Sequence, residues 1–191
     1  LDCLEFIRRA RALGKYVVVG GPDATSSPRV YHEANTLVLG EAEVTLAPFL
    51  ADFSRGTPQP VYQSEAKANV AESPTPRFDL LKFDRYNHVG IQWCRGCPFN
   101  CEFCDIIELF GRVPRAKTSD QIVRELDRLY DLGYRGHIDL VDDNFIGNKK
   151  LAKQFLPVLK GWLEERNWPF EFTTEASINL GIVLQGDGKL A

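Results

Sequence analysis

The sequence of residues 89–104 is VGIQWCRGCPFNCEFC, a short apolar run followed at once by four cysteines. Val89–Trp93 has the length and composition of a β-strand that ends where the cysteines begin. The last three cysteines, Cys97, Cys101 and Cys104, follow a C-x3-C-x2-C spacing, with Phe103 just before the last. Three thiolates on one loop can bind three irons of a 4Fe–4S cluster and leave the fourth iron open to another ligand. The spacing therefore predicts a redox-active iron–sulfur site.

A structural zinc site is the main alternative interpretation of these cysteines. Zinc usually takes four Cys or His ligands, often as two C-x2-C pairs that lie well apart in the sequence. The pairs here, Cys94/Cys97 and Cys101/Cys104, are separated by only three residues, and a distant ligand such as His137 has no supporting pattern. The odd number of five cysteines disfavours a disulfide framework. The sequence favours the cluster, with Cys94 outside the motif as a small buried hydrophobic residue.

The composition is that of an ordinary globular protein. The 191 residues are 44% apolar and 26% charged, and the net charge is −3. We expect no nucleic-acid partner, because no strong positive charge would attract one, and no transmembrane segment, because no apolar run reaches about 18 residues. Reduced thiols and a metal site suit the cytoplasm. The absence of any methionine, even an initiator, indicates a piece of a longer protein.

The first 56 residues alternate between helical and strand patterns. Helices are predicted over residues 2–13 and 42–53. Short parallel strands, buried on both faces, are predicted over Tyr16–Val19 and Thr36–Leu39, and a loop containing glycine follows each of them. This order predicts part of a doubly wound, Rossmann-like α/β sheet.

A second alternation follows a predicted linker. Residues 57–88 are polar and contain several prolines, as in an inter-domain linker. Residues 89–180 are expected to form about half of a (β/α) barrel, and the glycine-rich tail 181–191 is left unassigned. The predicted strands of this half-barrel are 89–93, 137–141 and 170–174, and its predicted helices are 118–132 and 149–165, the latter with a possible kink at Pro157.

The cysteine spacing at the exit of a first barrel strand resembles the radical S-adenosylmethionine (SAM) superfamily. The resemblance implies that Cys97, Cys101 and Cys104 hold a 4Fe–4S cluster whose fourth iron is chelated by SAM, and that Phe103 packs near the adenine. Reductive cleavage of SAM would then give a 5′-deoxyadenosyl radical that abstracts hydrogen from a substrate. Active sites of β/α barrels form where the strands end, which agrees with a loop that opens after Trp93.

Two further strand exits offer candidate SAM contacts. Where the superfamily often has a Gly-Gly-Glu-like stretch for the amino group of SAM, this sequence has Asp142, Asp143 and Asn144. A carboxylate or amide oxygen can still accept that ammonium, although these residues could instead cap the next helix. By resemblance, Glu175 and Ser177 are candidates for the ribose or the methionine end of SAM, with loop polarity as the alternative. No role is assigned to the basic residues after the cysteine loop, Arg112, Arg115 and Lys117.

The first domain resembles the cobalamin-binding domains that precede many radical SAM barrels. Its candidate cobalamin contacts are two strand exits, Gly20 with Gly21 and Gly40 with Glu41, where glycine lets the backbone approach a ligand closely. A tight turn is the alternative interpretation of the Gly-Gly pair. The family's Asp-x-His-x-x-Gly segment does not occur in this sequence, so any cobalt-ligating histidine would lie upstream of Leu1.

The stretch from Arg95 to Arg115, with Val141–Phe145, resembles the branch of this group that includes hopanoid methylases. The resemblance implies C-methylation of an unactivated carbon, in which SAM is both the methyl source for cobalamin and the source of the radical. Alternative functions are a radical SAM oxidative cyclase, a methylthiotransferase, or a non-catalytic iron–sulfur or zinc-binding fragment. The implied partners are a small-molecule or lipid substrate and an external electron donor such as flavodoxin or ferredoxin.

Overall fold

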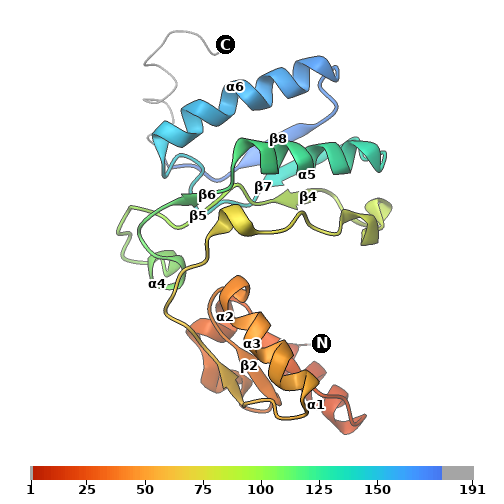
Figure 1. Cartoon of the computed structure of the whole chain (residues 1–191), viewed down its shortest axis with the longest axis vertical. Coiled ribbons are helices and arrows are strands. Elements are labelled where there is room, and N and C mark those ends of the chain that lie inside the picture. Colours follow the sequence, from red (N-terminus) through yellow and green to blue (C-terminus); the bar gives the residue numbers. More distant parts are fainter. Residues whose placement is uncertain (1, 178–191) are drawn as a thin grey trace. The chain divides into compact units, whose positions relative to one another are not determined.

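The computed structural model describes residues 2–177, which form two compact units (Figure 1). The first unit contains the residues up to Ala68 together with Glu108–Phe110, and the second contains Asn69–Ile107 and the residues from Gly111 onward. The unassigned tail at 181–191 lies outside the described residues. In the described range, no helix combines the length and the apolar character that crossing a bilayer would require.

The first unit is built on a three-stranded parallel sheet with helices on both faces. Its elements are α1 (Cys3–Ala12), β1 (Val18–Gly20), α2 (Pro22–Ser26), a 3-10 turn (Pro28–Tyr31), β2 (Thr36–Val38), α3 (Ala42–Ser54) and β3 (Val61–Tyr62). The strand order is β1-β2-β3. Leu37 packs with Ile7 of α1 and Ala24 of α2, whereas its neighbour Val38 packs with Phe49 of α3. The doubly wound α/β arrangement predicted for this part of the chain is therefore confirmed.

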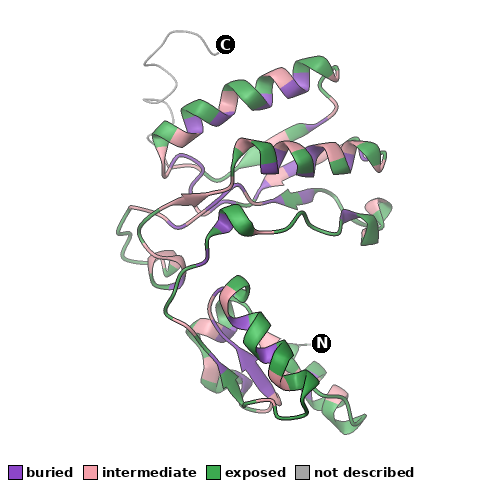
Figure 2. Ribbon diagram, in the orientation of Figure 1, coloured by how far each residue is buried: buried purple, intermediate pink, exposed green. Residues whose placement is uncertain are grey.

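Burial on both faces is confirmed for one of the two predicted strands. All three residues of β2 are buried, because helices cover both faces of this strand and neighbouring strands pair with both its edges (Figure 2). β1 lies at an edge of the described sheet, and Val18 is 40% exposed. An unbroken apolar run does not distinguish a central strand from an edge strand, so this part of the prediction is wrong for β1.

β3 lies within residues 57–88, which the sequence predicts to be a linker. Val61 pairs with Leu37 in the parallel ladder, and the Tyr62 hydroxyl donates to Asp52 of α3 at 2.8 Å. A two-residue strand among prolines leaves no alternating pattern to read, so only these tertiary contacts define it. The rest of the range holds three single-turn 3-10 helices, at Val70–Glu72, Phe78–Leu80 and Phe83–Arg85.

The second unit is built on a parallel sheet with the strand order β4-β7-β8. From β4 onward the elements are β4 (Val89–Ile91), β5 (Cys94–Arg95), α4 (Ile106–Phe110, of which Glu108–Phe110 belong to the first unit), β6 (Arg115–Ala116), α5 (Ser119–Asp131), β7 (His137–Leu140), α6 (Lys149–Glu165) and β8 (Glu171–Thr174). β5 and β6 form a separate antiparallel pair. α5 and α6 cover one face of the parallel sheet (Figure 1), and Ile138 and Leu140 share a core with Leu126 and Phe155. Three strands with two crossover helices form part of a (β/α) barrel.

Trp93 anchors the end of β4 in this core. Its ring stacks on Phe155 of α6 at 5.1 Å between centroids and lies 4.8 Å from the ring of Phe145. Trp93 is 2% exposed. Because large buried aromatic side chains define position as well as stability, the chain leaves the sheet toward the cysteines from a fixed point.

α5 begins with a reciprocal cap. The Thr118 side chain accepts from the Gln121 backbone N–H at 3.2 Å, and the Gln121 side chain accepts from the Thr118 backbone N–H at 2.9 Å. We expect Thr118→Ala to lower the free energy of unfolding by about 1 kcal/mol, because it removes one of these two bonds. Urea unfolding followed by tryptophan fluorescence measures this in the second unit, which holds all three tryptophans. Ser119→Ala, one residue on, is the control, and an equal loss there would contradict the role of the cap.

Candidate functional site

The cysteine loop leaves the carboxyl end of β4 and returns toward α5. Gly96 opens it with φ of +95°, a conformation that favours glycine. The Cys97 N–H donates to Gly111 O at 3.2 Å, and the Cys104 N–H donates to Cys101 O at 3.1 Å. The loop thus has its own internal hydrogen bonds and a fixed entry.

The three motif thiols are free and within reach of solvent. Cys97 and Cys104 are half-buried, Cys101 is exposed, and none forms a disulfide. Among residues 2–177, no three His, Cys, Asp or Glu side chains converge as the ligands of a single metal ion. A cubane is larger than one ion, and each of its irons takes its own thiolate, so three separate thiols on one loop fit such a cluster by their chemistry.

Cys94 differs from the other three cysteines. It is 1% exposed, and its thiol donates to the Asn144 backbone carbonyl at 3.4 Å. Burial, reinforced by the nearby Asp142 carboxyl, raises the pKa of the Cys94 thiol. Because the thiolate is the form that binds metal, this environment supports the prediction that Cys94 is not a ligand.

Asp142 joins the end of β7 to the start of the cysteine loop. One of its carboxyl oxygens accepts from the backbone N–H groups of both Trp93 and Cys94 at 2.8 Å. The other oxygen is buried and has no hydrogen-bond partner among the described residues. Burial raises the pKa of Asp142 to about 7, although the two backbone donors oppose the rise.

The next two residues continue the same pattern along the loop. Asp143 accepts from the Gly96 N–H at 2.7 Å, and the Asn144 amide donates to Cys97 Sγ at 3.7 Å. The stretch Asp142–Asn144, predicted to contact SAM, therefore holds successive positions of the cysteine loop. The helix-cap alternative is not what the structure shows, because Asn148 caps α6.

The exit of β8 lies beside the same stretch. The Ser177 N–H donates to the Asn144 side-chain oxygen at 3.2 Å, and the Phe145 N–H donates to Glu175 O at 2.9 Å. The Ser177 hydroxyl is buried without a partner among the described residues, and the Glu175 residue is exposed. Phe103, in the cysteine loop, is 94% exposed, so its ring is open to solvent.

Of the predicted cobalamin residues, Gly20 is the last residue of β1, whereas Gly21, Gly40 and Glu41 lie in the turns that follow β1 and β2. Gly21 and Gly40 have φ of +100° and +80°. The Gly40 N–H donates to the Thr25 hydroxyl at 2.9 Å, and Glu41 is buried at the start of α3. A cavity of about 420 Å³ lies near the Gly40–Glu41 loop, between residues 44–48 of α3 and residues 61–64. The carboxyl end of this parallel sheet is thus glycine-lined and hollowed, as in α/β folds that bind ligands there.

Gly20 has a different role, because it lets two strands approach. A Cβ at this position would lie 2.6 Å from the Val38 carbonyl oxygen. We expect Gly20→Ala to destabilise the first unit by about 1–3 kcal/mol, as overpacking does. Hydrogen exchange of the β1 and β2 amides, followed by mass spectrometry, measures this locally. Gly161→Ala, where a Cβ in α6 meets nothing within 4 Å, should instead leave these amides unchanged; unchanged exchange in Gly20→Ala would contradict the prediction.

No protein-family model matches the chain. An uncharacterised methyltransferase of Synechocystis sp. is 49% identical over 181 residues, which are 94% of this chain and 34% of that protein. The hopanoid C-2 methylase of Rhodopseudomonas palustris is 37% identical over 180 residues, which are 92% of this chain and 34% of the methylase. This chain is similar to the hopanoid-methylase branch of cobalamin-binding radical SAM proteins. It spans about one third of the length of these curated relatives.

One solved structure has a similar fold. The cobalamin-dependent S-adenosylmethionine radical enzyme OxsB, with aqua-cobalamin bound, aligns with a TM-score of 0.68 at 21% identity. The alignment covers 88% of this chain and 27% of OxsB. The fold class predicted from the sequence, a partial doubly wound cobalamin-type domain followed by a partial radical SAM barrel, is thereby confirmed.

Sequence reasoning missed a buried ion pair that follows the cysteine loop in the chain. Lys117 Nζ donates to Glu125 Oε1 at 2.6 Å, and both side chains are almost fully buried. Burial raises the pKa of Glu125, and Lys117 opposes that rise. Lys117 is thus a structural residue between β6 and α5, which its place in a run of basic residues does not reveal.

Sequence reasoning also missed a row of polar side chains on the sheet face opposite α5 and α6. His137 Nε2 lies 2.9 Å from the Thr173 hydroxyl, which donates to Asp139 Oδ1 at 3.2 Å. His137 and Asp139 alternate along β7 with Ile138 and Leu140, which lie in the core, so the period-two pattern of β7 was the available signal.

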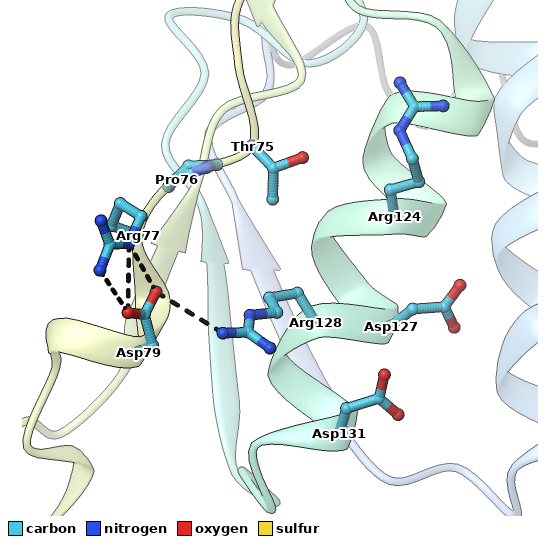
Figure 3. A pocket seen from close by; sticks show the side chains of 8 residues that line it. All are labelled: Thr75, Pro76, Arg77, Asp79, Arg124, Asp127, Arg128 and Asp131. Atoms are coloured by element: carbon cyan, nitrogen blue, oxygen red, sulfur yellow. Dashed lines mark hydrogen bonds and ion pairs between the residues drawn. The ribbon is translucent and has the colours of Figure 1, made fainter.

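A second cavity, of about 660 Å³, lies in the second unit beside α5 (Figure 3). Arg77 forms hydrogen bonds to Asp79, and Arg128 lies 3.7 Å from the same carboxylate. Basic and acidic residues balance in its lining, and none of the predicted site residues belongs to it. Its lining residues are Thr75, Pro76, Arg77, Asp79, Arg124, Asp127, Arg128 and Asp131.

Proposed function

We propose that the protein containing this chain is a cobalamin-dependent radical SAM methyltransferase that acts on an unactivated carbon. The observation that carries the proposal is the loop of three free thiols, which successive polar residues after β7 hold at the ends of parallel strands. The similarity to a hopanoid C-2 methylase and to a second methyltransferase over nearly the whole chain supports methyl transfer as the reaction.

The chain's residues would divide the binding of the cofactors among them. Cys97, Cys101 and Cys104 would hold the 4Fe–4S cluster. When bound, the reduced cluster supplies an electron to SAM, and cobalamin supplies a carrier for the methyl group. The buried Ser177 hydroxyl, which lacks a partner among residues 2–177, suits a polar group of SAM. Glu175, which also follows β8, is exposed and is a second candidate.

Phe103 and the three residues after β7 are further candidates for interaction with SAM. The exposed Phe103 ring offers an apolar face for adenine. Asp142, Asp143 and Asn144 would act on SAM mainly through the loop, because the contacts described above tie them to Trp93–Cys97.

Cobalamin would be bound by the first unit. Gly21 and Gly40 would let the backbone approach the cofactor, Gly20 would keep the end of β1 close to β2, and Glu41 would fix the loop that begins α3. The cavity of about 420 Å³ beside this loop supports the proposal, because ligands of doubly wound sheets lie outside the carboxyl ends of the strands.

A small-molecule or lipid substrate, an electron donor such as flavodoxin or ferredoxin, and a cytoplasmic location complete the proposal. Oxidative cyclisation and methylthiolation would begin with the same reductive cleavage of SAM and differ in what the substrate radical does next. A non-catalytic iron–sulfur or zinc protein differs in lacking that step.

Anaerobic reconstitution of the chain with iron, sulfide and hydroxocobalamin tests the proposal. We expect a brown protein that cleaves SAM to 5′-deoxyadenosine on reduction and retains cobalamin through gel filtration. Retention of cobalamin without cleavage of SAM would support cobalamin binding by the first unit and would contradict the radical SAM activity. A colourless protein with one zinc per chain would reject the enzyme assignment.

A further inference from the structure

Asn144 lies where the ends of three parallel strands meet. It follows β7, its side-chain oxygen accepts from Ser177 beyond β8 at 3.2 Å, and its side-chain nitrogen donates to Cys97 beyond β4 at 3.7 Å. The residue is 3% exposed. A single amide thus connects the exit of the third strand to the first sulfur of the cysteine loop.

The orientation of this amide follows from its partners. The Ser177 backbone N–H is a donor only, so it requires the carbonyl oxygen of Asn144 and leaves the NH2 group for Cys97. The Asn144 backbone carbonyl is held as well, by the Gly147 N–H at 2.9 Å and the Cys94 thiol at 3.4 Å. With both ends fixed, the donor cannot turn away from the sulfur without breaking buried hydrogen bonds.

The chemistry of such a contact is that of an outer-shell hydrogen bond to a metal ligand. In the cluster-bound protein, Cys97 Sγ would be a thiolate rather than a thiol. A donor aimed at that sulfur withdraws charge from it and favours the reduced cluster, which carries one more electron. Hydrogen bonds to the sulfurs are one of the factors that set the reduction potentials of iron–sulfur clusters.

We propose that Asn144 is a positioning residue that holds Cys97 and raises the reduction potential of the cluster. The inference rests on the proposed function, because it requires that Cys97 ligate a cluster. It assigns Asn144 a role toward the cluster ligand, in place of the direct SAM contact that the sequence suggests.

Potentiometric titration of the reconstituted full chain, followed by electron paramagnetic resonance, tests the role without any turnover. In Asn144→Leu, which removes the donor at similar volume, the reduced-to-oxidised ratio at a fixed potential should fall about tenfold, a downward shift of about 59 mV for a one-electron couple. Asn144→Asp keeps the acceptor for Ser177 but turns a carboxylate toward the sulfur, so its potential should fall further. Asn148→Asp makes the same chemical change at the α6 cap, where the side chain accepts from Leu151, and should leave the potential within error.

The outcomes separate the two levels of the proposal. A wild-type chain that assembles no cluster rejects the proposed function itself. Clusters in wild type and both Asn144 variants with one common potential reject only the role of Asn144. If Asn144→Leu does not fold, Asn144→Asp decides alone. A folded Asn144→Asp protein that has lost the cluster supports the positioning role of Asn144. A folded Asn144→Asp protein whose cluster has the wild-type potential overturns that role.

Discussion

Alanine substitution of Cys97, Cys101 or Cys104 is expected to abolish the iron–sulfur cluster, whereas alanine at Cys94 should leave it in place. Each of the three ligates one iron in the proposal, and the loop holds no spare thiol near them, because Cys94 is buried and its thiol is occupied by the Asn144 carbonyl. Iron and sulfide content, visible absorption and electron paramagnetic resonance of anaerobically reconstituted protein measure the loss.

The Cys94 variant is the matched control for these three. It removes a thiol from the same stretch of eleven residues and tests whether any cysteine there is enough. Retention of a full cluster after loss of one motif cysteine, together with loss of the cluster in Cys94→Ala, would assign the ligands differently. Four equal losses with one zinc in the wild-type chain would restore the zinc interpretation.

Asp142→Ala is expected to cause a large loss of stability in the second unit. The substitution leaves the backbone N–H groups of Trp93 and Cys94 buried without an acceptor. Each unsatisfied buried donor costs about 1–3 kcal/mol, so the free energy of unfolding should fall by about 2–6 kcal/mol. Urea unfolding monitored by tryptophan fluorescence reports on this unit, and Asp142→Asn, which keeps an acceptor oxygen, should lose less.

Wild type and Asp142→Asn together test how the stability depends on pH. The pKa of Asp142 is raised from 3.8 in the unfolded chain to about 7 in the folded one. The folded state therefore binds this proton more tightly, so its contribution to stability is complete below pH 3.8 and is lost as the pH rises to about 7. Wild type should lose stability relative to Asp142→Asn across this interval. A constant difference between them would show that the carboxyl does not titrate there.

Much of the fold can be read from the sequence because its signals are local. The apolar periodicity of residues 149–165 predicts α6, and the structure has that helix at Lys149–Glu165. A helix is predicted over residues 118–132, and the structure has α5 at Ser119–Asp131, capped by Thr118. Such patterns depend on neighbours within one or two turns, which the chain order already places together.

Long-range pairing is where the prediction ends. β3 lies in a segment that reads as a linker, and β1 lies at an edge of the sheet that the described residues form, although its composition matches that of the buried β2. Neither result follows from local periodicity, because strand order and burial depend on which segments meet in space.

The candidate site divides in the same way. The spacing of Cys97, Cys101 and Cys104 is covalent information, since a few bonds keep the three thiols on one loop whatever the rest of the chain does. The roles of Asp142–Asn144 are not, because their partners lie about 50 residues away in the chain, as in the 49-residue separation of Asp142 and Trp93. The order of residues thus determined that three thiols share one loop, and it determined the α/β class. Only folding, by bringing the ends of β4, β7 and β8 to one edge of a parallel sheet, decided which polar side chains support the cysteine loop.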